Sequence, residues 1–268
     1  MVPVPGMAAV SDPVATAAAA LAVSRHAVSL TGSGTSAESG VPTFRDAQDG
    51  LWAQYRPEDL ATPEAFERDP GFVWDWYEWR RGIVADVEPN PGHDAIAELQ
   101  TRLPRVTLIT QNVDGLHQRA GSRDVIEFHG NIMRSRCSDE QCSVEQCSVQ
   151  HCVVDVPRDA ESSPPPCPNC GAPIRPDVVW FGEAIPESAL EAALSAIADC
   201  DVIIVVGTSA QVQPAASLAA QAGALGATLV EINPETTPLS ARADIAIRGP
   251  SGELLPQIVR ALADAGSH

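Results

Sequence analysis

The chain has 268 residues, of which 35 are acidic and 17 are basic, so its formal net charge is −18. With 44% hydrophobic residues, it is long and apolar enough for one large domain, or for one domain that carries a smaller insert. A chain so poor in basic residues lacks the footprint that binds nucleic acid or an anionic membrane surface, so we expect neither partner.

The composition of the first 24 residues leads us to expect no targeting signal there. Its apolar stretch, residues 14–23, is mostly alanine and far shorter than the roughly 20 residues of a membrane-spanning helix. The first 24 residues contain no Arg or Lys, whereas secretory and mitochondrial signals need basic residues. We therefore expect a cytoplasmic protein whose seven cysteines are reduced and available for a metal rather than for disulfides. No feature of the sequence indicates an oligomeric state.

Short runs rich in Val and Ile alternate with helical patterns along the chain. Strands are expected at 26–31, 106–110, 125–128, 202–206 and 228–232, and helices at 14–24, 93–102, 186–198 and 214–224. Continuous apolar runs separated by helices predict an α/β fold, a Rossmann-like doubly wound parallel sheet covered on both faces. Ligands of such sheets bind beyond the carboxyl ends of the strands, where each of these runs is followed by small or polar residues.

Two segments interrupt this alternation and predict a smaller inserted domain. Residues 49–86 are rich in aromatic residues and helical in period, and residues 131–176 are rich in Cys and Pro. The predicted large domain comprises residues 1–48, 87–130 and 177–268, and the small domain combines the helical insert 49–86 with the metal-binding insert 131–176.

A glycine-rich loop, Gly32-Ser33-Gly34-Thr35-Ser36, follows the first predicted strand. Glycine lets the backbone turn sharply and approach a pyrophosphate, whose oxygens would accept hydrogen bonds from free N–H groups. The loop lacks the full G-x-G-x-x-G spacing of dinucleotide sites, so an ordinary Gly/Ser turn is an equally good interpretation of this fragment.

The loop continues to Phe44 and Arg45, and five further motifs follow it in order. They are Thr110-Gln111-Asn112-Val113-Asp114, Phe128-His129-Gly130, Val179-Trp180-Phe181-Gly182-Glu183, Gly207-Thr208-Ser209 and Asn233-Pro234-Glu235. This ordered set resembles the sirtuins, the NAD-dependent protein-lysine deacylases, over about residues 26–252. The resemblance implies that the large domain binds NAD, a consumed co-substrate, and that the partners are acylated lysine side chains of proteins.

The resemblance also implies the reaction. The acyl-lysine carbonyl oxygen attacks C1′ of the nicotinamide ribose, nicotinamide leaves, and the acyl group moves to the 2′-OH, giving O-acyl-ADP-ribose and free lysine. His129 matches the family's catalytic histidine, and imidazole is a base near neutral pH. Asn112 matches a second catalytic residue, within a set that contacts ribose and nicotinamide: Gln111, Asn112 and Asp114. The alternative is a strand-end turn capped by Asn and Asp.

Further residues match the family's NAD contacts. Phe44 would shield the reactive ribose from water and Arg45 would face phosphate. The remaining matches are Gly207, Thr208 and Ser209 for the phosphates or the adenosine ribose, Asn233 and Glu235 for that ribose, and Ser251 for a loop beside the adenine. On the substrate side, Val179, Phe181 and Gly182 resemble the segment that pairs with the substrate backbone, although a buried core strand would look the same.

Tyr77 and Arg80 lie three residues apart in the helical insert, which places them on one helix face. With Ala61, sixteen residues before Tyr77, they match the Tyr-x-x-Arg motif of class III sirtuins, which implies removal of succinyl and malonyl groups and also of acetyl. A terminal carboxylate on the acyl chain needs a cationic, bidentate partner, and a small residue leaves room for that chain. The alternative is a helix with a solvated Arg and a packed Tyr.

Cys167-Pro168-Asn169-Cys170-Gly171 has the spacing of one half of a zinc knuckle. For the second pair we predict Cys137 and Cys142, with Cys147, Cys152 or His151 as alternatives to Cys142. Four thiolates leave no open position on the metal, so a single structural zinc ion is expected.

Three other activities compete with deacylation. A protein ADP-ribosyltransferase would keep His129 and the NAD loops but release no free lysine. A dehydrogenase would leave Tyr77 and Arg80 without a role. A non-catalytic NAD-binding zinc module would not need Asn112, Asp114 and His129 together.

Overall fold

The computed structural model describes residues 12–43, 55–142 and 163–265. The predicted site residues Phe44 and Arg45, and the alternative metal ligands Cys147, His151 and Cys152, lie outside these ranges.

A six-stranded parallel sheet forms the larger part of the molecule, with the strand order β3-β2-β1-β6-β7-β8. Its strands are β1 (Ala27–Thr31), β2 (Val106–Thr110), β3 (Ile126–Glu127), β6 (Val202–Val206), β7 (Thr228–Ile232) and β8 (Ile245–Ile247). All five expected strands are present and parallel, which confirms the predicted fold class. The three-residue edge strand β8 was not predicted. The strand order reverses between β1 and β6, and doubly wound folds bind their ligands in a crevice at the carboxyl ends of the two strands that flank such a reversal.

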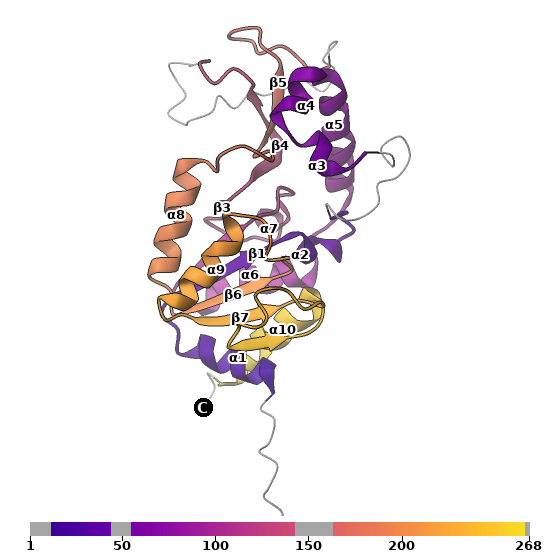
Figure 1. The fold of residues 1–268 in the computed structure, drawn as a ribbon. Helices are drawn as coiled ribbons and strands as arrows, with labels where there is room; N and C mark the ends of the chain where they lie inside the picture. The colour runs from indigo at the N-terminus through magenta and orange to yellow at the C-terminus, as the bar shows by residue number, and fades with distance from the viewer. Residues whose placement is uncertain (1–11, 44–54, 143–162, 266–268) are drawn as a thin grey trace, which may run out of the picture.

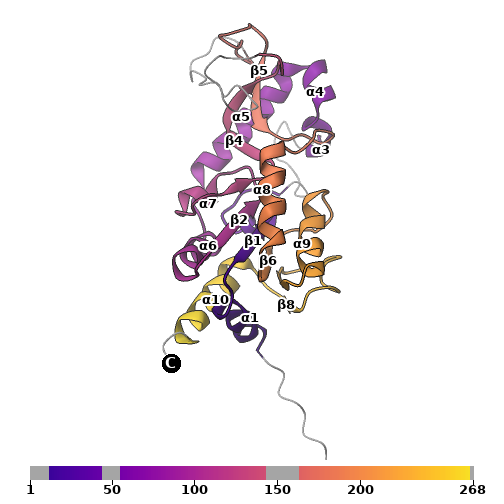
Figure 2. The same ribbon diagram turned by 90° about the vertical axis from the view of Figure 1, so that its left-hand side faces the viewer.

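Helices cover both faces of this sheet (Figures 1 and 2). One face packs against α1 (Pro13–Ala22), α6 (Pro91–Arg102) and α10 (Ser251–Ala265), and the other against α8 (Glu187–Ala198) and α9 (Ala215–Ala224). The strands bury both sides because their residues are apolar throughout, as the five fully buried residues of β6 show. Two short helices, α2 (Ser33–Ala37) and α7 (Leu116–Arg119), follow β1 and β2 on the side where the strands end.

A smaller unit lies beyond the carboxyl ends of the strands, at the top of Figure 1. It contains the antiparallel pair β4 (Gly130–Cys137) and β5 (Ile174–Val178), and the helices α3 (Pro57–Leu60), α4 (Pro63–Arg68) and α5 (Pro70–Asp86). Arg81 joins α5 to β4 by donating to the carbonyl oxygens of Ile132 at 2.6 Å and Arg134 at 2.9 Å. This unit comes from the two segments expected to form the insert, while the exact borders of the domain division stay a prediction.

The helices of the unit begin where the sequence supplies caps. Thr62 accepts a hydrogen bond from the Ala65 N–H at the start of α4, and Asp69 accepts one from the Phe72 N–H at the start of α5. Proline occupies the first position of both helices, where a missing N–H costs nothing. These caps fix the direction of α5 and hence the side chains that it presents.

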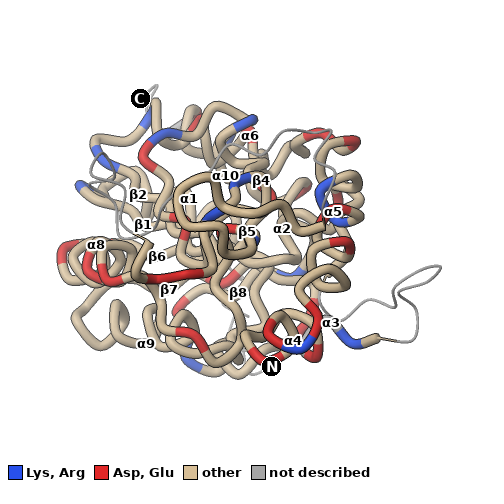
Figure 3. Tube along the Cα trace, turned by 90° about the horizontal axis from the view of Figure 1, so that it is seen from above, with Lys and Arg blue, Asp and Glu red and all other residues tan. Residues whose placement is uncertain are grey.

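Acidic residues are spread over several elements, including α8 and the α3–α4 region, rather than confined to one face (Figure 3). Among the residues that the structure describes, no helix is both long and apolar enough to cross a membrane.

Candidate active site

Two glycine loops meet at the switch point between β1 and β6. A Cβ atom at Gly34 would lie 2.8 Å from the Gly207 carbonyl oxygen, and one at Gly207, whose φ is +59°, would lie 2.4 Å from the Thr35 nitrogen. The N–H groups of Gly32 and Gly34 donate to the carbonyl oxygens of Val206 and Gly207. These two amides were expected to be free for a pyrophosphate. Instead, the glycines let the two loops pack backbone against backbone, which shapes the crevice.

Hydrogen bonds beside these loops join the ends of the strands β2, β6 and β7. Gln111, after β2, donates from Nε2 to the Thr208 hydroxyl at 3.2 Å, and Asn233, after β7, donates from Nδ2 to the Thr208 carbonyl at 2.8 Å. The Asn233 side chain also accepts a hydrogen bond from the Glu235 N–H at 3.1 Å. The structure therefore brings the Gln111, Thr208 and Asn233 motifs together, with the exposed Glu235 at the rim.

His129 lies at the junction between the sheet and the smaller unit. Its Nδ1 is 3.1 Å from the Gln111 carbonyl oxygen, which can only accept, so Nδ1 carries the proton and Nε2 keeps a lone pair. Burial lowers the pKa of His129, against the opposing effect of the carbonyl contact. The imidazole is therefore neutral near pH 7, the form that a general base requires.

Asn112 and Asp114 are both buried, but they make different contacts. Asp114 accepts a hydrogen bond from the Leu116 N–H at 2.9 Å, so the turn-capping interpretation holds for this residue. Asn112 instead donates from Nδ2 to the Ser36 hydroxyl at 2.9 Å, across the crevice. Ser36 also contacts Nε2 of His93 at 3.3 Å. His93 was not singled out in the sequence, where it reads only as a residue of the first turn of α6.

The segment after β5 connects His129 to the helical insert. The Val179 N–H donates to the His129 carbonyl oxygen, and the Phe181 N–H donates to the Ala61 carbonyl oxygen, both at 2.9 Å. This segment is a turn, and its Phe181 side chain is 41% exposed, so the alternative of a buried core strand is wrong here. Trp180, in contrast, is only 3% exposed.

Tyr77, Arg80 and Ala61 are all buried. Tyr77 and Ala61 share one apolar cluster with Trp180, and the Tyr77 hydroxyl accepts a hydrogen bond from the Trp180 indole N–H at 2.9 Å. Arg80 is 7% exposed, which contradicts the alternative of a solvated Arg. Burial lowers the pKa of Arg80, against the opposing influence of Tyr77 and Asp114.

Four sulfur atoms converge at the outer end of β4 and β5. The Sγ atoms of Cys137, Cys142, Cys167 and Cys170 lie within 4.8 Å of one another. The Sγ–Sγ distances are 3.5 Å for Cys137–Cys170 and 3.8 Å for Cys142–Cys167. Four thiolates around a zinc ion at about 2.3 Å would have sulfurs about 3.8 Å apart, so the cluster fits one tetrahedral zinc ion. Cys142 joins this cluster, as predicted.

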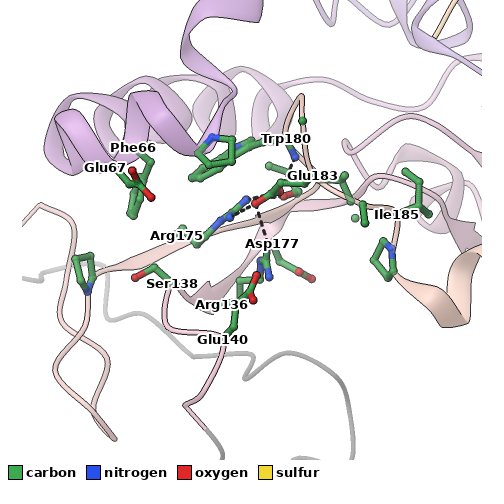
Figure 4. Close-up of a pocket in the computed structure, with 18 of the residues that line it drawn as sticks. Phe66, Glu67, Arg136, Ser138, Glu140, Arg175, Asp177, Trp180, Glu183 and Ile185 are labelled. Carbon is green, nitrogen blue, oxygen red and sulfur yellow. Dashed lines mark hydrogen bonds and ion pairs between the residues drawn. The ribbon is translucent and has the colours of Figure 1, made fainter. Parts of the chain in front are cut away.

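A cavity of about 1090 Å³ opens between α4, the β4–β5 pair and the turn after β5 (Figure 4). Arg175 and Glu183 cross its wall as an ion pair with N–O distances of 2.5 and 2.9 Å, and Glu183 also accepts a hydrogen bond from the Trp180 N–H. The cavity lies beside the turn after β5, since Val179, Trp180 and Gly182 line it.

Three predicted site residues make no contact that assigns them a role. Ser251 was expected in a loop but begins α10, where its hydroxyl donates to the Glu38 carboxylate at 2.8 Å. Ser33 is exposed on α2, and Ser209 is half-buried after β6.

Comparisons with known proteins agree with this geometry. Residues 32–214 match the model of the Sir2 family. The chain is 51% identical over 239 residues to NAD-dependent protein deacylase 2 of Pyrobaculum aerophilum, covering 89% of this chain and 92% of that protein. It is 49% identical to NAD-dependent protein deacylase 1 of Pseudomonas aeruginosa, covering 90% and 95%.

A solved structure described as a complex of a Sir2 homolog with NAD superposes with a TM-score of 0.83 at 46% identity. The superposition covers 93% of this chain and 94% of the homolog. The strand-end motifs, the four-cysteine cluster and these likenesses agree over most of the chain, which therefore belongs to the Sir2 family of NAD-dependent protein deacylases.

Proposed function

We propose that this deacylase preferentially removes succinyl and malonyl groups from the lysine side chains of proteins, and removes acetyl groups more slowly. The NAD-dependent deacylation itself follows from family membership. The products are nicotinamide, O-acyl-ADP-ribose and free lysine.

The observation that carries the acyl preference is the buried Arg80 beside Tyr77. A guanidinium remains charged in proteins, and at Arg80 the Asp114 carboxylate favours the charged form against the effect of burial. The terminal carboxylate of a succinyl or malonyl chain would be a further anion, and its two oxygens match the paired N–H donors of arginine. Burial also raises the pKa of Tyr77, so its hydroxyl stays protonated and can donate to the same carboxylate. Ala61, whose side chain is small, lies in the same buried cluster as Tyr77.

The remaining site residues take roles on the NAD side. NAD supplies an electrophilic ribose carbon to which the acyl oxygen adds. His129 accepts a proton at Nε2, because its Nδ1 proton is held by the Gln111 carbonyl. Asn112 and Asp114 present amide and carboxylate groups to the nicotinamide end of the crevice. Asn233 and Glu235 hold the adenosine ribose, and Phe44 and Arg45 act at the reactive ribose and the phosphates.

A zinc ion bound by the four cysteines would hold β4 and β5 together and would take no part in the chemistry. Its four thiolates fill every position of a tetrahedral site, which leaves none for water or substrate. Trp74 and Ile174 pack against the thiols and shield them on the inner side.

The test compares acetyl-, malonyl- and succinyl-lysine peptides of one sequence, with release of free lysine peptide and nicotinamide measured at saturating NAD. We expect a higher kcat/KM for succinyl or malonyl peptides. In Arg80→Met, this value should fall at least about 30-fold, because the carboxylate loses its buried partner. Arg102→Met is the matched control, since Arg102 is an exposed helical arginine paired with Glu98.

Two results would contradict the proposal. Equal or faster removal of acetyl by the wild type would assign Tyr77 and Arg80 a structural role only. Transfer of label from radioactive NAD to protein, without release of free lysine peptide, would replace deacylation by ADP-ribosyl transfer.

A further inference from the structure

Trp180 makes a polar contact that its place in an apolar cluster does not require. The indole is 3% exposed and packs between Phe66, at a ring-centroid distance of 5.2 Å, and the guanidinium of Arg175, whose central carbon lies 3.2 Å from the ring centroid. Its Nε1–H donates to the hydroxyl oxygen of Tyr77 at 2.9 Å. This bond joins the turn that borders the substrate segment to the helix that carries Arg80.

The hydrogen bond restricts the direction of the Tyr77 proton. A phenol has one proton to donate, and its oxygen accepts hydrogen bonds on its lone pairs. Because the indole N–H occupies the acceptor side, the Tyr77 proton must point away from Trp180. Burial raises the pKa of Tyr77, so the hydroxyl remains a donor at neutral pH.

The indole is itself held on two sides. Glu183 accepts a hydrogen bond from the Trp180 backbone N–H at 2.8 Å and forms the ion pair with Arg175, which in turn stacks on the indole ring (Figure 4). Arg136 approaches the same carboxylate at 3.6 Å. Rotating the indole away from Tyr77 would therefore disturb a buried ionic cluster, which makes Trp180 a rigid reference point for the phenol.

We propose that Trp180 is a positioning residue for acyl selectivity, because its indole N–H fixes the Tyr77 hydroxyl with the proton directed at the terminal carboxylate of the acyl chain. This inference rests on the proposed function. An acetyl group has no such carboxylate, so the effect of Trp180 through Tyr77 is confined to succinyl and malonyl substrates. Simple core packing, in contrast, would affect all acyl groups alike.

The test is the ratio of kcat/KM for succinyl and acetyl peptides. Trp180→Phe keeps an aromatic ring under Arg175 and removes the N–H donor. We expect the ratio to fall about three- to tenfold, mainly through the KM of the succinyl peptide, as the loss of one hydrogen bond predicts. In a Tyr77→Phe background, Trp180→Phe should lower the ratio no further, because Trp180 acts through the missing hydroxyl.

Trp74→Phe is the matched control. It removes another buried indole, three residues before Tyr77 on the same helix, where the ring packs against the cysteine cluster. This variant should keep the wild-type ratio. If Trp180→Phe does not fold, replacement of Trp180 by 3-benzothienylalanine serves instead, because sulfur takes the place of the N–H in a ring of nearly the same shape.

The inference is overturned if removal of the N–H donor leaves the ratio unchanged, or if the ratio falls equally with and without the Tyr77 hydroxyl. A wild-type enzyme without any succinyl preference would overturn the proposed function, and this inference with it. If the wild-type enzyme prefers succinyl peptides and keeps this preference after the Trp180 indole N–H is removed, only the role of Trp180 is overturned.

Discussion

The proposed site has two halves, one at the carboxyl ends of the parallel strands and one in the smaller unit, and different kinds of contact hold them. At the strand ends, the parallel strands position the glycine loops and the hydrogen bonds of Gln111, Thr208 and Asn233. Most of these contacts involve the backbone. In the smaller unit, three arginines that are 6–8% exposed, Arg80, Arg136 and Arg175, combine with buried aromatic rings and four cysteines.

Under the proposed function, this difference separates the chemistry common to all acyl groups from the selectivity among them. A backbone-built crevice tolerates many side-chain changes, because strand order and loop packing define it. Buried charged side chains depend on single partners, and removing one partner leaves an uncompensated charge. We therefore expect changes in the NAD half to affect all acyl groups alike, and changes in the acyl half to alter the ratio of rates between acyl groups.

Removal of the metal should have the largest effect and should separate the two halves. Without zinc, the four thiols no longer hold the outer end of β4 and β5, and a structural zinc site contributes about 10–16 kcal/mol in small domains. We expect a strong chelator, or Cys167→Ala, to abolish deacylation, while the sheet keeps its far-UV circular dichroism and binds NAD in calorimetry. Simultaneous loss of NAD binding and of the sheet would show that the halves fold as one unit.

His129→Ala should lower kcat about 10²–10⁴-fold for every acyl group, as loss of a general base does. His26→Gln, which changes a buried histidine at the opposite end of β1, is the control. Since burial lowers the pKa of His129, the base is neutral above that value and protonated below it. The wild-type kcat should therefore stay level from pH 8 to about 6.5 and fall only at lower pH. A decline that begins above pH 7 would contradict this.

Asn233→Ala should have a moderate effect that is confined to NAD. The Asn233 side chain donates to the Thr208 carbonyl and accepts from the Glu235 N–H, so its loss loosens the loop that we propose holds the adenosine ribose. We expect the KM for NAD to rise about tenfold, the equivalent of one or two hydrogen bonds. The succinyl-to-acetyl ratio should not change, and a changed ratio would argue against the separation of the two halves.

Glu183→Gln should produce the smallest change, which is a loss of free energy of unfolding that depends on pH. Arg175 holds the pKa of Glu183 below its ordinary value, against the opposing effect of burial. The carboxylate therefore stabilises the folded state above its unfolded pKa of about 4.3, and this contribution disappears as the pH falls through the lower folded value. Wild type should exceed the variant by about 1–3 kcal/mol in urea unfolding at pH 7. A difference that does not narrow below pH 4 would contradict the ion pair.

The strands of the parallel sheet can be predicted from the sequence, whereas the strands of the smaller unit cannot. The strands β1, β2, β6 and β7 are continuous apolar runs, so both their existence and the position of the site at their ends could be inferred. The strands β4 and β5 could not be inferred, because Arg residues and Pro176 interrupt any alternation of apolar and polar residues.

The helix α10 was also missed, since Gly252 and Pro256 interrupt it, although its apolar residues Leu255, Ile258, Val259 and Leu262 have helical spacing. The contacts of Trp180 with Tyr77 and of Ser36 with His93 join segments far apart in the chain, so no local sequence pattern predicts them.

One comparison tests the central claim most directly. A succinyl-lysine peptide and its succinamyl counterpart, in which a neutral amide replaces the terminal carboxylate, have nearly the same size but differ in charge. If Arg80 and Tyr77 read the carboxylate, the wild-type kcat/KM should be about 10- to 100-fold higher for the succinyl peptide, and Arg80→Met should remove this difference. Equal values for the two peptides in the wild type would contradict carboxylate recognition by this site.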